Sequence, residues 1–168
     1  MTTTASSARR DDDLKPNSQY VTLGVEREVF AVDVDRVREI LDLQPLSRVP
    51  NAPPFMVGMI DVRGRGVPVI DLRVKLGLPA VPPTPSTRIL VMETTIAGRS
   101  TLLGLMTDRV FEVAPLAASS MEPPPEIGVR WRSEYNRAIA RHNGAFVIIF
   151  NLSHLFAADE VAFIGGEV

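Results

Sequence analysis

Side chains able to perform covalent chemistry are few in this chain and poorly spaced for it. Its 168 residues include no cysteine and two histidines, His142 and His154, and neither histidine has a carboxylate or a second histidine at ligand spacing. No serine lies in a G-x-S-x-G elbow of the hydrolase type. We therefore predict no catalytic residue and no metal site, and we expect both histidines at the surface or at its boundary.

Carboxylates and glycines give no stronger indication of an enzyme. Four carboxylates stand near the ends of predicted strands: Asp33, Asp61, Asp71 and Glu112. Capping of turns is the usual role of such residues, although spacing alone leaves a glycosidase-type pair open. Gly64 and Gly66 match neither a phosphate-binding loop nor a dinucleotide fingerprint, so we predict no cofactor.

Two arginines on a predicted turn, Arg63 and Arg65, are the polar residues that most need an explanation. They alternate with glycines between two apolar runs of residues 58–73, a pattern typical of a β-hairpin, and the turn itself requires no arginine. In one interpretation Arg63 pairs with Asp61 or Asp71 of its own hairpin, although exposed ion pairs of this kind contribute little to stability. In the other, its planar and permanently charged guanidinium binds a carboxylate on a partner.

Short strands are expected to position these residues. Apolar runs predict four pairs of strands: 20–23 with 29–34, 59–62 with 67–70, 89–92 with 102–106, and 138–141 with 146–150. Asn143-Gly144, which separates the last two runs, is the strongest short signal for a hairpin. Pro68 lacks a backbone N–H, so we expect it on an edge strand or at a bulge.

Helices are expected only as short turns. Apolar side chains at positions 37, 40 and 41 predict a short helix over residues 35–41, with Asp35 as its N-cap. Residues 72–78 either end a strand or form one helical turn, and a further turn is predicted over residues 152–156.

A division of the chain follows from its composition. Few apolar residues and clustered charges predict a disordered tail over residues 1–18. The three prolines of residues 81–87 predict a stiff linker near the middle of the chain. We therefore expect two units, 19–80 and 88–158, followed by a tail over 159–168.

The two predicted units share short sequences in the same order. Residues 35–40 read D-R-V-R-E-I and residues 108–113 read D-R-V-F-E-V, while V-I-D-L at 69–72 is echoed by I-F-N-L at 149–152. This similarity predicts a duplicated unit of about five short strands. Closure of each unit into a small barrel would remove the exposed edges of so small a sheet.

Composition and charge restrict the class of protein. Hydrophobic residues make up 45% of the chain and charged residues 23%, and the net charge of −2 favours no global attraction to nucleic acid or to an anionic membrane. No signal sequence or apolar run of the ~20 residues needed for a membrane span is present, so we expect a cytoplasmic protein. A small barrel that binds single-stranded nucleic acid stays open as an alternative, although only 6% of residues are aromatic.

The chain resembles the CheW family of chemosensory adaptors from Tyr20 to Phe156. The matching segments include Y-V-T-L-G-V-E-R-E-V-F-A-V-D-V, V-P-N-A-P-P-F-M-V-G-M-I-D-V-R-G, V-P-V-I-D-L-R and L-L-G-L-M-T-D-R-V. A G-[VM]-x-N-L-R-G segment followed by P-V-I-D-L-R is specific to this family and to the regulatory domain of the kinase CheA. No catalytic or phosphotransfer module of that kinase can be accommodated in 168 residues, so the stand-alone adaptor is the better match.

The resemblance implies an all-β fold of two tandem five-stranded barrels, SH3- or OB-like, with or without exchanged strands, joined by a third hydrophobic core. It implies a non-enzymatic adaptor, monomeric alone, that couples methyl-accepting chemoreceptor tips to a CheA-type histidine kinase in membrane-associated arrays. The positions that match the receptor-binding groove are Val37, Glu39, Arg63, Val110 and Val113. Ile127 matches a position that contacts the kinase regulatory domain.

One residue departs from the family pattern. The usual N-L-R-G reads Asp61-Val62-Arg63-Gly64 in this chain. An aspartate two residues before Arg63 would either hold the arginine back or orient it toward a partner.

Overall fold

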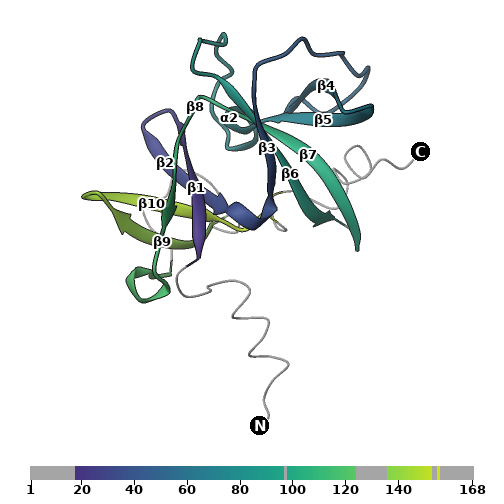
Figure 1. Ribbon diagram of the computed structural model, residues 1–168. Helices are drawn as coiled ribbons and strands as arrows, with labels where there is room; N and C mark the ends of the chain where they lie inside the picture. Colours follow the sequence, from purple (N-terminus) through teal and green to yellow (C-terminus); the bar gives the residue numbers. More distant parts are fainter. Residues whose placement is uncertain (1–17, 97, 124–135, 153–154, 156–168) are drawn as a thin grey trace.

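The described part of the computed structural model consists of ten strands and short helical turns, and it covers residues 18–96, 98–123, 136–152 and 155 (Figure 1). The strands are β1 (Gln19–Val25), β2 (Glu28–Asp33), β3 (Val37–Asp42), β4 (Met56–Val62), β5 (Arg65–Asp71), β6 (Arg88–Ile96), β7 (Arg99–Thr107), β8 (Arg109–Pro115), β9 (Asn136–His142) and β10 (Ala145–Phe150). The helical elements are η1 (Val34–Arg36), α2 (Leu72–Lys75) and η2 (Ala118–Ser120). The predicted all-β class and the four predicted hairpins are confirmed. Apart from Ser18, the predicted tails lie outside the described residues.

The strands form two five-stranded sheets, and each sheet takes strands from both halves of the chain. The first sheet has the order β8-β1-β2-β10-β9 and the second the order β3-β6-β7-β5-β4, and Figure 1 shows the two lying next to each other. The boundary between the sheets therefore does not follow residues 81–87, because the predicted units 19–80 and 88–158 each contribute to both sheets. Of the two arrangements implied by the resemblance, the structure has the one with exchanged strands.

Both sheets follow one plan. When the strands of each half are numbered one to five, each sheet has the order three-one-two-five-four, with strands one and two from one half and the rest from the other. Strands two and five are parallel in both sheets, as β2 with β10 and as β7 with β5. The isolated bridges repeat as well, since Ser47 pairs with Met59 and Glu122 pairs with Ile139. The predicted duplication is thereby confirmed.

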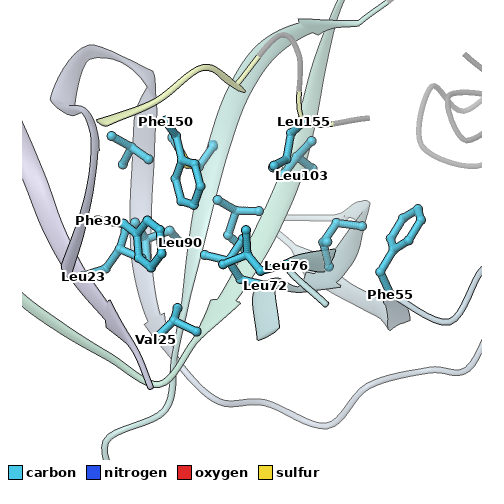
Figure 2. Close-up of a cluster of buried hydrophobic side chains, with 14 of the residues drawn as sticks. Leu23, Val25, Phe30, Phe55, Leu72, Leu76, Leu90, Leu103, Phe150 and Leu155 are labelled. Carbon is cyan, nitrogen blue, oxygen red and sulfur yellow. The ribbon is translucent and has the colours of Figure 1, made fainter. Parts of the chain in front are cut away.

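The largest hydrophobic cluster of the described residues lies between the two sheets. Figure 2 shows its side chains converging from β1, β2 and β10 of the first sheet and from β6, β7 and α2 of the second. Phe30 and Phe150 stack at its centre, with ring centroids 4.7 Å apart. Two smaller clusters cover the other faces of the sheets, one around Tyr20 and Val147 and one around Val67. This arrangement is the third, joining core that the resemblance implied.

A buried arginine ties the second sheet to the first. Arg73 in α2 is only 7% exposed. Its Nη1 donates to Asp108 Oδ2 at 2.7 Å, its Nη2 donates to Glu26 Oε1, and its Nε donates to the carbonyl of Pro79 at 2.9 Å. Glu26 lies in the β1–β2 turn and Asp108 between β7 and β8. One guanidinium therefore holds three loops from both sheets.

Residues 35–41 do not form the predicted helix. The 3-10 turn η1 has Asp33 rather than Asp35 at its N-cap, and β3 follows it directly. A register shift between Val37 and Glu39 lies in the pairing of β3 with β6, and the edge position leaves Ile40 44% exposed. The exposed Ile40 interrupts the alternation of apolar and polar residues that is typical of a strand. The apolar positions 37, 40 and 41 therefore have the spacing of a helix face although they lie on a strand.

Pro68 occupies an interior strand and lies outside the register shift between Met56 and Gly58, so the expectation of an edge strand or a bulge is wrong. β5 lies between β7 and β4. The parallel pairing with β7 begins at Val69, one residue after Pro68. At Pro68, β5 is paired with β4 but not yet with β7. No hydrogen bond to β7 therefore requires the N–H that proline lacks.

Candidate protein-binding site

The tip of the β4–β5 hairpin is a two-residue turn that holds Arg63 in an unusual backbone conformation. Arg63 has a φ of 55° and Gly64 a φ of 85°, and two consecutive positive values are typical of a type I′ hairpin turn. Asp61 caps this turn, because its Oδ1 accepts a hydrogen bond from the N–H of Gly64 at 2.8 Å. Asp71 instead accepts from the N–H of Arg73 at the start of α2. Neither aspartate therefore pairs with Arg63.

Arg63 pairs with the opposite edge of its own sheet. Its Nε donates to Glu39 Oε2 at 2.6 Å, and Glu39 lies on β3, the edge strand farthest from β4 in the sheet order. The second sheet therefore curls until its edges meet at this corner. The hydrogen bond with Glu39 raises the pKa of the Arg63 guanidinium, yet 79% of the arginine side chain stays exposed. Two of the predicted site residues are thus brought together at the surface.

The three predicted valines stand on the edge strands β3 and β8. Val37 and Val110 are half-buried and pack against the cluster between the sheets. Val113 is 51% exposed and lies in register with Val21, a member of the same cluster. Paired residues on neighbouring strands share a face of the sheet. The valines therefore form an apolar rim where the central core meets solvent.

A cavity of about 460 Å³ opens beside the ion pair of Arg63. Its lining residues are Arg38, Glu39, Val62, Arg63, Arg65, Val91, Glu93, Ser100 and Leu102. Glu93 accepts hydrogen bonds from the hydroxyl of Ser100 and from Arg38, and both lower the pKa of its carboxyl. Sequence reasoning missed the ion pair of Arg38 with Glu93, because the two residues lie on different strands and no motif connects them. Three guanidiniums and two carboxylates leave the cavity with an excess of one positive charge.

The first sheet has a corner of the same design with different chemistry. Pairing registers place residues 62–65 and 142–145 at the same position of their hairpins, and both turns have two positive φ values. His142 Nε2 lies 3.1 Å from Glu112 Oε2. Glu112 follows the register shift of β8 just as Glu39 follows that of β3. A histidine–glutamate pair therefore takes the place of the arginine–glutamate pair.

Several predicted features lie outside the described residues or give no site within them. Ile127, the predicted kinase contact, and His154 are among the residues outside the description. Within residues 18–96, 98–123, 136–152 and 155, no group of three or more His, Asp or Glu side chains is arranged to hold a metal ion. The same residues contain no helix long and apolar enough to cross a membrane.

Comparison with known proteins agrees with this architecture. The chemotaxis protein CheW of Rhizobium meliloti is 26% identical over 142 residues, which cover 84% of this chain and 89% of the relative. The CheW of Klebsiella aerogenes is 29% identical over 146 residues (87% and 86%), and that of Bacillus subtilis is 33% identical over 114 residues (68% and 70%). The crystal structure of scaffolding protein TtCheW from Thermoanaerobacter tengcongensis superposes with a TM-score of 0.76 at 29% identity, covering 86% of this chain and 95% of that one. The CheW-like domain matches residues 19–160, and the chain belongs to this family of chemotaxis adaptors.

Proposed function

We propose that this chain is a non-enzymatic adaptor that couples the cytoplasmic tips of methyl-accepting chemoreceptors to the regulatory domain of a CheA-type histidine kinase. Membership in the CheW-like family supports this function. The observation that carries it is the pair of edge strands β3 and β8, whose corresponding residues Ile40 and Val113 are 44% and 51% exposed. Apolar side chains exposed at the same place in both copies of a duplicated fold favour a protein-binding surface.

A receptor helical hairpin suits the apolar rim. Its apolar side chains would cover Val37, Val110 and Val113, in the manner of a helix that binds a groove. The charged pair of Glu39 and Arg63 at the neighbouring corner would set the register of the helices, because polar groups at a rim give specificity more than affinity. An interface of standard size buries about 800 Å² on each partner.

The kinase contact is proposed for a separate surface, since an adaptor must hold both partners at once. The family resemblance supports Ile127 as a residue of that contact. Each contact would be modest, and strength would come from many linked copies in an array, because linkage raises the effective concentration of every further contact. The chain itself would be a cytoplasmic monomer that is recruited to the membrane by its receptors.

The receptor contact is tested by placing a charge on the exposed rim. We expect Val113→Glu to weaken co-sedimentation with receptor-containing vesicles about tenfold or more, because docking would bury an unpaired carboxylate. Val81→Glu is the matched control, since Val81 is also an exposed valine (45%) but lies on the 81–87 segment. Equal co-sedimentation of the Val113→Glu variant and the wild-type chain would reject the proposed groove.

A salt titration separates this function from the nucleic-acid alternative. Binding to a single-stranded oligonucleotide that weakens steeply with salt would favour a phosphate-tracking surface. We expect no such binding, because the exposed Phe111 and Phe146 each lie beneath an arginine of their own sheet, Arg109 and Arg141. One face of each ring is therefore covered, and with 6% aromatic residues and a net charge of −2 the chain offers few stacking platforms and no global attraction to phosphates.

A further inference from the structure

The two halves of the chain are joined by strand pairing. Among the described strands, four of the eight pairings connect β1–β5 of the first half with β6–β10 of the second: β1 with β8, β2 with β10, β3 with β6 and β5 with β7. The other four are the hairpins within each half. Each half alone therefore has four strand edges that the complementary half pairs, and nothing in this pairing requires both halves to belong to the same chain.

The covalent connection between the halves is exposed and weakly held. Residues 79–86 are all exposed to solvent. At one end the carbonyl of Pro79 accepts a hydrogen bond from Arg73 Nε at 2.9 Å, and at the other end residues 84–87 close a turn. Between these ties, residues 80–83 form no hydrogen bond with any other described residue. The middle of the connection can therefore take another path without loss of a hydrogen bond.

This connecting segment, residues 79–87, is more apolar than a surface connection needs to be. Residues 79–83 read P-A-V-P-P, and Val81 is 45% exposed. A run of consecutive exposed apolar residues favours a surface that another surface covers. The segment carries no charge, so two copies of it do not repel each other. Its prolines also favour an extended and stiff path over a compact loop.

We infer that the chain forms a strand-swapped dimer with a second copy of itself, in which β1–β5 of one chain pair with β6–β10 of the other. The two connecting segments then lie side by side about the twofold axis, and each covers the P-A-V-P-P run of its copy. All four pairings between the halves are kept, so the exchange sacrifices no strand hydrogen bond. The inference does not depend on the proposed function, although each dimer would carry two copies of the rim of β3 and β8.

Concentration decides between the closed monomer and the swapped dimer. A short connection holds the two halves of one chain at an effective concentration in the millimolar range. A second copy therefore competes only near ~1 mM, and dilute solutions contain the closed monomer. Separating the halves of a folded chain breaks all four pairings between them, so the dimer forms while the chain folds rather than from folded monomers.

Disulfide trapping distinguishes a swapped dimer from two closed chains in contact. The chain contains no cysteine, so Asp42→Cys with Arg88→Cys introduces a single pair. Asp42 and Arg88 are partners on β3 and β6, one from each half, and the side chains of both reach solvent. The variant is refolded at ~10 µM and at ~1 mM, below and near the effective concentration, then oxidised and separated by size-exclusion chromatography with light scattering. We expect a dimer peak at the higher concentration whose chains stay linked on a denaturing gel without reductant, and a monomer peak that gives single chains.

A pair of cysteines within one half is the matched control. Thr95 and Ser100 are partners on β6 and β7, so Thr95→Cys with Ser100→Cys should give single chains on the denaturing gel from both peaks. The wild-type chain, refolded in parallel, should show the same dimer peak. Absence of that peak from the wild-type chain at ~1 mM would overturn the inference, and so would a dimer peak of the Asp42→Cys, Arg88→Cys variant that gives single chains after oxidation.

Variants of the connecting segment test its part in the dimer. Val81→Glu places a carboxylate between the two segments, and we expect the dimer fraction at ~1 mM to fall about fivefold or more. Insertion of about six Gly and Ser residues after Pro83 relaxes the connection and should also favour the monomer. Phe146→Glu is the control, because Phe146 is 55% exposed but lies on β10. Equal dimer fractions in all of these variants would overturn the inference. The receptor measurement uses the monomer peak, so Val81→Glu stays valid as its control.

Discussion

Replacement of Arg73 by methionine should destabilise the whole protein, because this arginine serves both sheets. The change keeps much of the buried side-chain volume but removes three hydrogen bonds, to Asp108, Glu26 and the carbonyl of Pro79. Breaking a buried ion pair by removing one partner costs about 3–5 kcal/mol. Because the Glu26 side chain is 38% exposed, water can partly replace its lost partner, and we expect a loss of about 3 kcal/mol in the free energy of unfolding.

Urea denaturation followed by circular dichroism measures this loss. With a slope of about 2 kcal/mol per molar urea, the midpoint should fall by about 1.5 M. Arg38→Met is the control, since Arg38 also pairs with a glutamate but its side chain is 51% exposed, and we expect its midpoint to change little. A midpoint for Arg73→Met as close to the wild-type value as that of Arg38→Met would show that the network does not join the sheets energetically.

Two further predictions follow from the strand exchange and from burial of a carboxylate. Separate fragments cut within residues 81–87 should each be unfolded by circular dichroism and should regain β structure only when mixed, because neither fragment contains a complete sheet; one fragment folding alone would contradict this. Burial raises the pKa of the Asp71 carboxyl above its ordinary value, so the folded state keeps this carboxyl protonated to a higher pH than the unfolded state does. The contribution of this site to the free energy of unfolding therefore falls as the pH rises from the ordinary pKa through the raised one. Asp71→Asn keeps the acceptor for the Arg73 N–H and should be more stable than the wild-type chain in thermal melts at pH 7 but not near pH 3; equal melting temperatures at pH 7 would contradict the burial penalty.

The hairpins could be predicted from the sequence because their signals are local. Asn143-Gly144 and Arg63-Gly64 mark turns between apolar runs, and each pair of strands is held by neighbours along the chain. The exchange of strands between the two halves could not be predicted from local sequence signals. It depends on the parallel pairings of β2 with β10 and of β5 with β7, which join segments far apart in the chain. A linker at 81–87 is compatible with either arrangement.

In the candidate site, too, contacts between residues far apart in the chain could not be predicted from local signals. Arg63 could be predicted as a binding residue because its turn does not require an arginine. Its partner Glu39 could be connected to it only through the family resemblance. The contact of His142 with Glu112 had no signal in the sequence, since it forms only when the first sheet curls and brings its two edge strands together. Expecting Asp61 near Arg63 was reasonable on spacing, yet capping the turn satisfies that carboxylate first.

Strand exchange has a mechanical consequence for an adaptor. In a simple tandem pair of barrels, residues 81–87 would act as a hinge, and a partner on one barrel could move without affecting a partner on the other. Here each half contributes strands to both sheets, so the halves cannot separate without breaking the parallel pairings within each sheet. The central cluster around Phe30 and Phe150 and the ties of Arg73 oppose sliding of one sheet on the other. A displacement imposed at the rim of β3 and β8 would therefore move the two sheets as one body, which is what the proposed link between a receptor and a kinase would require.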